Sequence, residues 1–177
     1  MSESTTGTRS PTGSWAHHPK LLVVDMGDLQ VTDDPEAQLI TYALGSCIAV
    51  IVHDPVHKRG GMLHYMLPLS QINATKARER PGMFADLGIP LLFERLYRLG
   101  CRRQDLVVKV AGGGQINDAS GVFEIGKRNH TMLRKMFWKA GMPIAAEDCG
   151  GSRSRTARLV VATGQVTIRS MGKEYEL

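Results

Sequence analysis

The feature that most constrains the fold is a continuous apolar run that contains several β-branched residues. Residues 47–52 read CIAVIV, and His53, Asp54 and Pro55 follow directly. A run of this length and type favours a buried β-strand. It is also the longest apolar run in the chain and is far shorter than the roughly 18 residues that argue for a membrane-spanning helix. The sequence therefore predicts a domain built around a sheet, without membrane insertion.

The remaining segments predict further strands and two helices. Extended segments are expected at residues 21–26, 38–44, 60–67, 105–111, 143–148, 156–162 and 165–170. Amphipathic helices are expected at about 83–99 and about 127–140, each followed or ended by a glycine. Pro90 is expected to kink or divide the first helix, because proline lacks an amide donor and clashes with the preceding turn. The pattern predicts a mixed α/β domain in which helices cover a largely antiparallel sheet.

The chain divides into a tail and one domain. Residues 1–19 contain four Ser, four Thr and two Gly, which is the composition of a flexible tail. Residues 20–177 have the length of a single domain. The first residues include neither a basic segment nor the apolar stretch of a secretory signal, so a cytoplasmic protein is expected.

The charge balance favours acidic partners. The chain has 22 Lys+Arg against 17 Asp+Glu, which gives a formal net charge of +5. It has only two Trp and four Phe, and its basic residues lack the interleaved aromatic residues of single-stranded nucleic-acid binders. No nucleic-acid partner is expected. The loop at residues 150–158 is rich in Gly, Ser and Arg, and Arg153 and Arg155 are candidates for contacting an acidic partner helix.

The three cysteines, Cys47, Cys101 and Cys149, differ in their surroundings. An odd number without a C-x-x-C motif argues against a disulfide framework. Cys47 follows Gly45-Ser46 at the point where a turn enters the buried strand. Glycine allows a tight turn and the close approach of another group. Cys47 is therefore a candidate nucleophile, and the backbone at Gly45 and Ser46 is a candidate oxyanion site.

The expected hairpin makes His64 the candidate base for Cys47. The segment DPVH (54–57) suits a type I turn, with Asp at the first position and Pro at the second. If residues 54 and 57 close the hairpin, Cys47 lies directly opposite His64. Residues opposite each other on one face have Cβ atoms about 4.5–5.5 Å apart. A one-residue slip would place the two side chains on opposite faces.

Other interpretations of these residues remain open. Taken singly, Cys47 fits a small buried residue and His64 fits a histidine beside the core. A zinc site formed by Cys47, His53, His57 and His64 ranks lower, because the spacing lacks the close ligand pairs of structural zinc sites. No metal or cofactor is expected. The glycines at 112–114 lack the sequence context of a phosphate-binding loop, so a plain turn is expected there.

Seven motifs occur along the chain in an order and spacing that resemble those of a known family. They are LGSC (44–47), HDP (53–55), GGMLHYMLP (60–68), VAGGG (110–114), IGKRN (125–129), AEDCGG (146–151) and the closing TG-V-T-I-R strand. Together they resemble the CheD family, the chemoreceptor glutamine deamidases of bacterial and archaeal chemotaxis. Two departures are VAGGG, where the family often has Phe-Gly-Gly-Ala, and Cys149, which stands where other residues are usual.

The resemblance implies a cysteine hydrolase with Cys47 as nucleophile, His64 as general base and Thr41 as the residue that orients the histidine. It implies an α/β/α three-layer sandwich similar to the catalytic domain of cytotoxic necrotizing factor toxins. The implied reaction converts glutamines of methyl-accepting chemotaxis receptors to glutamate through a thioester, and glutamyl methyl esters would suit the same site. Two alternatives stay open: a regulatory partner of a CheC-type phosphatase with a minor catalytic role, and a thiol hydrolase acting on another amide.

Overall fold

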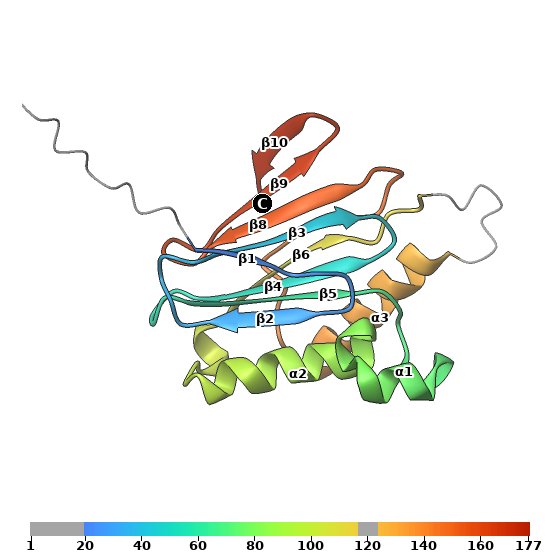
Figure 1. Ribbon diagram of the computed structural model, residues 1–177, viewed down its shortest axis with the longest axis horizontal. Coiled ribbons are helices and arrows are strands. Elements are labelled where there is room, and N and C mark those ends of the chain that lie inside the picture. Colours follow the sequence, from blue (N-terminus) through green and yellow to red (C-terminus); the bar gives the residue numbers. More distant parts are fainter. Residues whose placement is uncertain (1–19, 117–123) are drawn as a thin grey trace, which may run out of the picture.

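The apolar run forms the middle of a sheet. It lies in β4 (Ile48–Asp54), whose seven residues are all buried. β4 is the third strand of a five-stranded sheet, here called the central sheet, with the order β2-β5-β4-β6-β7. The structure is a computed structural model that describes residues 20–116 and 124–177 (Figure 1). The tail expected at residues 1–19 lies outside the described residues.

A second sheet, with the order β1-β3-β8-β9-β10, and three α-helices complete the described part of the chain. The other strands are β1 (Leu21–Val23), β2 (Leu29–Thr32), β3 (Gln38–Leu44), β5 (Arg59–Tyr65), β6 (Val107–Gly112), β7 (Ala146–Cys149), β8 (Arg155–Val160), β9 (Gln165–Ser170) and β10 (Lys173–Glu176). The helices are α1 (Ala74–Glu79), α2 (Ala85–Arg98) and α3 (Ile125–Ala140). Among the strands of the described residues, only β1–β3 and β6–β7 pair in parallel, which confirms the predicted mixed α/β class with a largely antiparallel sheet.

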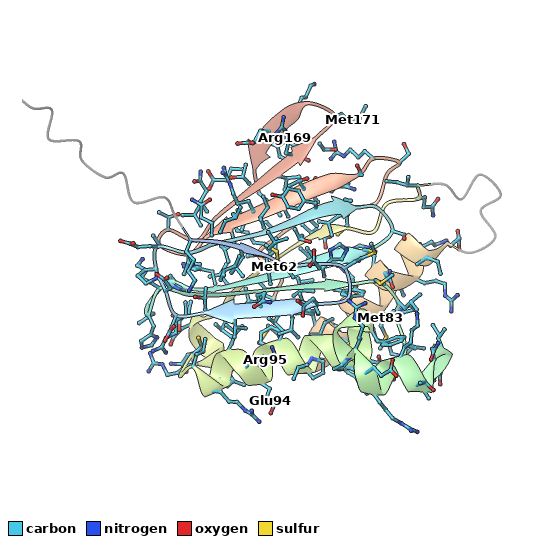
Figure 2. The ribbon with its side chains drawn as sticks, viewed as in Figure 1. Met62, Met83, Glu94, Arg95, Arg169 and Met171 are labelled. Atoms are coloured by element: carbon cyan, nitrogen blue, oxygen red, sulfur yellow. The ribbon has the colours of Figure 1, made fainter. Side chains whose placement is uncertain are left out.

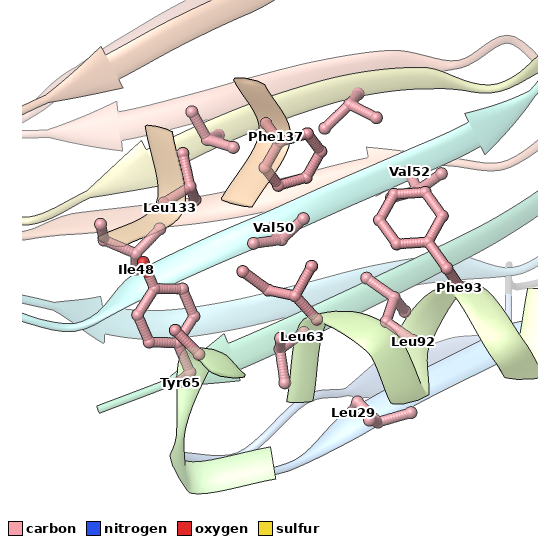
Figure 3. Close-up of a cluster of buried hydrophobic side chains, with 14 of the residues drawn as sticks. Leu29, Ile48, Val50, Val52, Leu63, Tyr65, Leu92, Phe93, Leu133 and Phe137 are labelled. Atoms are coloured by element: carbon pink, nitrogen blue, oxygen red, sulfur yellow. The ribbon is translucent and has the colours of Figure 1, made fainter. Parts of the chain in front are cut away.

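The central sheet is covered on both faces. The helices lie on one face and the second sheet lies on the other (Figure 1). On the helix side, Val50 and Leu63 of the central sheet pack with Leu92 of α2 and Phe137 of α3 (Figure 3). Alternate residues of β4 therefore enter two clusters, which explains why the run is apolar at every position. The cluster between the two sheets includes Leu39, Ala49, Ile51, Met62 and Leu159.

The order of layers differs from the one that the family resemblance implies. The layers are helix, sheet and sheet, and no described helix covers the outer face of the second sheet. Along β8 and β9, buried residues alternate with more exposed ones. Arg169 of β9 lies on the side of the molecule away from the helices (Figure 2). A sheet with this alternation can face water on one side, so it needs no third layer of helices.

The register of the β4–β5 hairpin also differs from the prediction. Asp54 pairs with Arg59 rather than closing on His57, and His64 pairs with Ala49 rather than Cys47. The connection has four residues, and Lys58 has a φ of +53°. Loops of this length are commonly built around a type I turn. The predicted register is therefore wrong by two residues, but a two-residue shift keeps Cys47 and His64 on the same face.

Several elements depend on packing that the sequence pattern does not reveal. The sequence predicts that Pro90 kinks or divides the first helix; the proline does not divide it, because α2 continues through Pro90. Buried residues on both sides of the proline, including Ile89 and Leu92, pack in the core beside the central sheet. The pattern does not predict the short strands β2 and β10, or α1, which has no buried residue. Within residues 20–116 and 124–177, no helix is long and apolar enough to cross a membrane.

Candidate active site

Cys47 lies in a short turn, residues 45–47, that joins β3 to β4 and is here called the nucleophile loop. The pairing of β3 with β8 shifts between Thr41 and Leu44, and Ala43 has a φ of +56°. The amide of Gly45 donates a hydrogen bond to the carbonyl of Ala43 at 2.9 Å. Gly45 therefore serves the turn, and its amide is not free to serve as an oxyanion donor.

The carbonyl groups of the nucleophile loop are all held by neighbouring segments. The amide of Gly114 donates to the Gly45 carbonyl at 2.7 Å, and the amide of Gly113 donates to the Cys47 carbonyl at 2.8 Å. Asn129 Nδ2 donates to the carbonyl of Ser46 at 3.0 Å. The glycines at 112–114 are thus a support for the nucleophile loop rather than the plain turn that the sequence predicts.

The glycine segment approaches too closely for any larger residue. A Cβ atom on Gly112 would lie 2.2 Å from the Cys47 carbonyl oxygen, and Gly112 has a φ of +121°. On the other side of the segment, a Cβ on Gly126 would lie 2.5 Å from the carbonyl oxygens of Gly113 and Gly114. Helix α3 can therefore pack directly against the segment that holds the nucleophile loop.

Two amides of the nucleophile loop remain as potential donors. Among the residues that the structure describes, no backbone carbonyl accepts a hydrogen bond from the N–H groups of Ser46 and Cys47, and the Cys47 N–H interacts with its own thiol. Two adjacent backbone N–H groups beside a nucleophile are the usual donors for the oxyanion of acyl transfer. Of the amides at the predicted oxyanion site, that of Gly45 is therefore engaged within the turn, and those of Ser46 and Cys47 remain the candidate donors.

Thr41 fixes the protonation of the His64 ring. Thr41 Oγ1 lies 2.6 Å from the Val24 carbonyl oxygen and 2.7 Å from His64 Nδ1. A hydroxyl has one proton, and the carbonyl can only accept, so Thr41 donates to Val24 and accepts from Nδ1–H of His64. His64 Nε2 then carries the lone pair, and this buried atom has no hydrogen-bond partner in the described part of the chain.

Cys47, His64 and Thr41 face the space between the two sheets. Cys47 belongs to the cluster between the sheets, and Thr41 is fully buried on the same side of β3 as Leu39. His64 pairs with Ala49, so Cys47 lies diagonally beside it across the hairpin. Cys47 is 9% exposed and His64 is 2% exposed. Thr41 and His64 are thus in direct contact, and Cys47 lies on the same buried face of the hairpin.

Burial makes the neutral forms of both groups more stable. Burial lowers the pKa of His64 to about 4, and the nearby negative charge of Asp25 opposes this shift. Burial raises the pKa of the Cys47 thiol, and its own backbone amide opposes that shift. At neutral pH the resting pair is therefore a thiol and a neutral imidazole, rather than a preformed ion pair.

The backbone of His64 is held by the segment that precedes β2. The His64 amide donates to the Asp28 carbonyl at 2.9 Å, and the Gly27 amide donates to the His64 carbonyl at 2.7 Å. The same segment supplies the Val24 carbonyl that orients Thr41. Residues 24–28 thus fix both the backbone of the histidine and the hydroxyl group that its ring contacts.

The two arginines that the sequence singles out for a partner have different positions. Arg155 is 2% exposed and donates to Asp148 Oδ1 at 2.9 Å and to the Gly150 carbonyl at 2.8 Å. Arg155 is thus a structural residue, and the expectation that it contacts a partner does not agree with its burial. Arg153 also pairs with Asp148 at 2.9 Å, but its side chain is 40% exposed.

The Asp148 carboxylate joins the two sheets. It lies on β7 and receives hydrogen bonds from Arg155, Tyr175 and Arg153. Burial by itself raises the pKa of Asp148, but these hydrogen bonds outweigh burial and hold the pKa well below its usual range. This charged carboxylate links β7 to β8 and β10. It thereby holds residues 151–153, whose backbone lies beside Gly114.

The other histidines and cysteines have separate environments. His53 Nε2 contacts the Val161 carbonyl at 2.8 Å, and His57 Nδ1 contacts Asp54 Oδ2 at 2.9 Å. Both lie toward the turn end of the hairpin, away from Cys47 and His64, so the fold does not assemble the alternative zinc site. Burial also raises the pKa values of the other two thiols, Cys101 to about 11 and Cys149 to about 12.

The comparisons with known proteins come from sequence and structure. A family model described as "CheD chemotactic sensory transduction" matches residues 66–170. The "Probable chemoreceptor glutamine deamidase CheD 2" of Anaeromyxobacter dehalogenans is 53% identical over 150 residues, covering 85% of this chain and 94% of that protein. The corresponding CheD 1 protein of Syntrophus aciditrophicus is 50% identical over 151 residues, covering 85% of this chain and 94% of the relative.

More distant proteins give a weaker likeness. The "Probable chemoreceptor glutamine deamidase CheD" of Methanococcus vannielii is 41% identical over 150 residues, covering 84% of this chain and 94% of that protein. Among solved structures, the Bacillus licheniformis hypothetical protein YfiH aligns with a TM-score of 0.38 at 15% identity, over 71% of this chain and 50% of that chain. The structural likeness is too low to support an argument.

Proposed function

The chain belongs to the CheD family, and from this premise we propose that it is a chemoreceptor glutamine deamidase that works through Cys47, His64 and Thr41. One observation carries the proposal. The hydrogen bonds from Thr41 to Val24 and from His64 to Thr41 leave the Nε2 lone pair of His64 free, on the face of the hairpin that it shares with Cys47. A nucleophile, a base and a group that orients the base are the elements of nucleophilic acyl transfer.

In the first step, His64 Nε2 takes the proton of the Cys47 thiol as the sulfur attacks the side-chain carboxamide carbon of a receptor glutamine. The carbonyl π bond becomes an oxyanion, and the N–H groups of Ser46 and Cys47 are the donors that stabilise it. In other enzymes, removal of one such donor costs about 2.7–4 kcal/mol in the transition state. Because the resting pair is neutral, proton transfer accompanies the attack.

In the second step, the protonated His64 gives its Nε2 proton to the departing nitrogen, so that ammonia leaves and a thioester remains on Cys47. The imidazolium keeps its hydrogen bond from Nδ1–H to Thr41, and the negative charge of Asp25 stabilises it. Nε2 then removes a proton from water as the oxygen attacks the thioester. The products are a glutamate side chain and the restored thiol. A glutamyl methyl ester would follow the same course with methanol as leaving group.

The decisive experiment compares the wild-type protein with Cys47→Ala on a cytoplasmic receptor fragment, with peptide mass as the readout. The wild type is expected to convert glutamine to glutamate, and an acid-quenched sample is expected to carry the acyl adduct on Cys47. The Cys101→Ala variant is the matched control, because that thiol is also buried but lies elsewhere. If the Cys47→Ala protein still forms glutamate, the assignment is wrong.

A second candidate function is that of a regulatory partner of a CheC-type phosphatase, which the family resemblance implies. A titration with the phosphatase tests this function. If the protein is a regulatory partner, wild type and Cys47→Ala are expected to bind the phosphatase with equal affinity. A phosphatase that fails to bind either protein excludes this second function. Because the proposed substrates are modified in the cytoplasm, we also propose a cytoplasmic location.

A further inference from the structure

Asn129 of α3 joins the nucleophile loop to the end of the strand that carries His64. Its Nδ2 donates to the Ser46 carbonyl at 3.0 Å and to the Met66 carbonyl at 2.8 Å. The residue is completely buried. Both partners of the amide group are carbonyl oxygens that can only accept, so Nδ2 must be the atom that faces them. Asn129 is thus a double donor between two loops.

The bond to Ser46 also determines where the Cys47 amide points. The chain has no cis peptide bond in the described residues, and in a trans peptide the C=O and N–H groups point in opposite directions. The Ser46 carbonyl and the Cys47 N–H belong to one such peptide. With the carbonyl fixed toward Asn129, the N–H is directed away from α3, and in the described part of the chain it interacts with its own thiol and with no backbone carbonyl.

The neighbouring peptide is held in the same way. The Gly45 carbonyl accepts from the amide of Gly114 at 2.7 Å, so the Ser46 N–H points away from the glycine segment. Two consecutive peptides are therefore oriented through their carbonyl groups by residues outside the nucleophile loop. Gly114 acts through its backbone, whereas Asn129 acts through a side chain and can be replaced.

We propose that Asn129 is a positioning residue that orients the Cys47 amide toward the oxyanion of the reaction. The inference rests on the proposed function and names a further residue that the reaction needs. Asn129 does not contact the reacting atoms; it acts through the Ser46–Cys47 peptide. Asn129 Oδ1 supports this role, because it is buried and has no hydrogen-bond partner among the described residues. A side chain kept for packing alone would not need to bury an unpaired oxygen.

The test compares two reactions of the same thiol in the full-length protein. Acylation of Cys47 by p-nitrophenyl acetate forms a C–S bond through a tetrahedral oxyanion and releases p-nitrophenolate. Alkylation by iodoacetamide forms a C–S bond by displacing iodide at a saturated carbon, with no oxyanion. The variant Asn129→Leu keeps a similar side-chain volume and removes both donor bonds. Tyr65→Phe is the matched control, because the Tyr65 hydroxyl donates to the Asn129 carbonyl at 2.8 Å and does not affect Nδ2.

In Asn129→Leu the rate of acylation is expected to fall about 10- to 100-fold, since removal of one oxyanion donor costs about 10²–10³ in other enzymes. The rate of alkylation is expected to stay within about twofold of the wild-type rate, because that reaction makes no demand on the amides. On the receptor fragment, kcat should fall while KM stays unchanged. Tyr65→Phe is expected to change neither rate of Cys47 modification.

Two results would overturn the proposal. If acylation and alkylation fall together in Asn129→Leu, the residue only maintains the structure of the loop. If neither rate changes, the residue has no role in orienting the amide. Should the leucine variant not fold, Asn129→Ala is measured in the same way. A wild-type protein that is acylated by p-nitrophenyl acetate but converts no receptor glutamine contradicts the proposed function, while the comparison of the two rates still decides the role of Asn129.

Discussion

The two ends of the β4–β5 hairpin differ in whether their buried polar groups have partners. At the turn end, Asp54 accepts hydrogen bonds from the amides of Val56 and His57 and contacts the His57 ring, and the His53 ring contacts the Val161 carbonyl. At the nucleophile end lie the three buried side-chain atoms that have no partner among the described residues. They are His64 Nε2, Asn129 Oδ1 and Arg155 Nε.

This difference indicates what each end contributes. Buried polar atoms without partners cost free energy and are uncommon in native structures. Of the three atoms at this end, His64 Nε2 is the acceptor that the proposed reaction needs, and the other two belong to residues that hold the surrounding backbone. The paired groups at the other end stabilise the hairpin and leave nothing for a ligand.

The largest expected effect comes from the two buried histidines. His64→Ala is expected to lower deamidation of a receptor fragment by at least about 10³-fold, because it removes the base. His53→Ala is expected to leave kcat unchanged and to lower the free energy of unfolding by about 1–3 kcal/mol, because the Val161 carbonyl loses its partner. Peptide mass and urea denaturation measure the two quantities.

The contrast between the histidines would be lost if the His53→Ala protein, corrected for its folded fraction, were as inactive as His64→Ala. The comparison of the two ends would then have no functional meaning. A normal kcat with a lower urea midpoint in His53→Ala supports the comparison.

The second prediction concerns two glycines with equally tight surroundings. A Cβ on Gly112 would lie 2.2 Å from the Cys47 carbonyl oxygen, and a Cβ on Gly164 would lie 2.3 Å from His53 Nδ1. Gly112→Ala is expected to lower kcat about 10²-fold, because a small displacement of the nucleophile loop misplaces both thiol and amides. Gly164→Ala is expected to lower only the free energy of unfolding, since it disturbs the end that carries no chemistry.

Both glycine variants should be compared at the same folded fraction, which circular dichroism and urea denaturation provide. Equal kcat values for the two variants would show that the position of the strain along the hairpin does not matter. They would contradict a functional difference between the two ends of the hairpin.

The third prediction concerns pH. The pKa of His64 is about 4 in the folded protein and about 6.5 in an unfolded chain. The unfolded chain binds this proton more readily, so the free energy of unfolding rises with pH between about 4 and 6.5. This contribution of His64 to the free energy of unfolding, about 3 kcal/mol, is fully present above pH 6.5 and is lost as the pH falls to 4. Replacement by His64→Gln should remove this part of the acid destabilisation.

Urea denaturation at several pH values measures this difference between wild type and His64→Gln. His53 is present in both proteins, so its own lowered pKa cancels in the comparison. Parallel pH profiles for the two proteins would mean that His64 is not a buried neutral base.

The smallest expected effect is at the exposed arginine. Arg153→Glu is expected to weaken binding of an acidic receptor fragment about 3- to 10-fold, since an exposed charge at the rim of an interface contributes modestly. Arg98→Glu is the matched control, because Arg98 is also exposed but lies on α2 beside Glu94. Equal affinities of the two variants, measured by titration calorimetry, would remove Arg153 from the receptor surface.

Much of the fold follows from local patterns in the sequence. The run at residues 47–52 and the alternation at 165–170 predict β4 and β9 because side-chain periodicity reports burial directly. The layer order does not follow in this way, since it depends on which face of each sheet meets the other. The register of the β4–β5 hairpin cannot be predicted from the sequence, because Lys58 adopts a positive φ that its residue type does not indicate.

Only part of the candidate site likewise follows from local patterns in the sequence. Cys47 and His64 are suggested by residue type and strand geometry, and Thr41 only by the family motif. Asn129 carries no signal from its residue type alone, because an asparagine in a helix is usually a solvated residue. The pairing of Asn129 with Ser46 and Met66 depends on contacts between residues more than 60 positions apart. The motif IGKRN, which ends at Asn129, was the one available signal.

The distribution of these residues along the chain has a consequence for protein synthesis. Thr41, Cys47 and His64 all precede residue 65, whereas the groups that orient the nucleophile loop, in the glycine segment and α3, follow residue 111. A nascent chain emerges from its N-terminus, so the thiol and the imidazole are made well before the segments that direct the Ser46 and Cys47 amides. In the proposed mechanism, the reacting groups therefore come first, and competence for catalysis is acquired last, when the second half of the domain has folded onto the first.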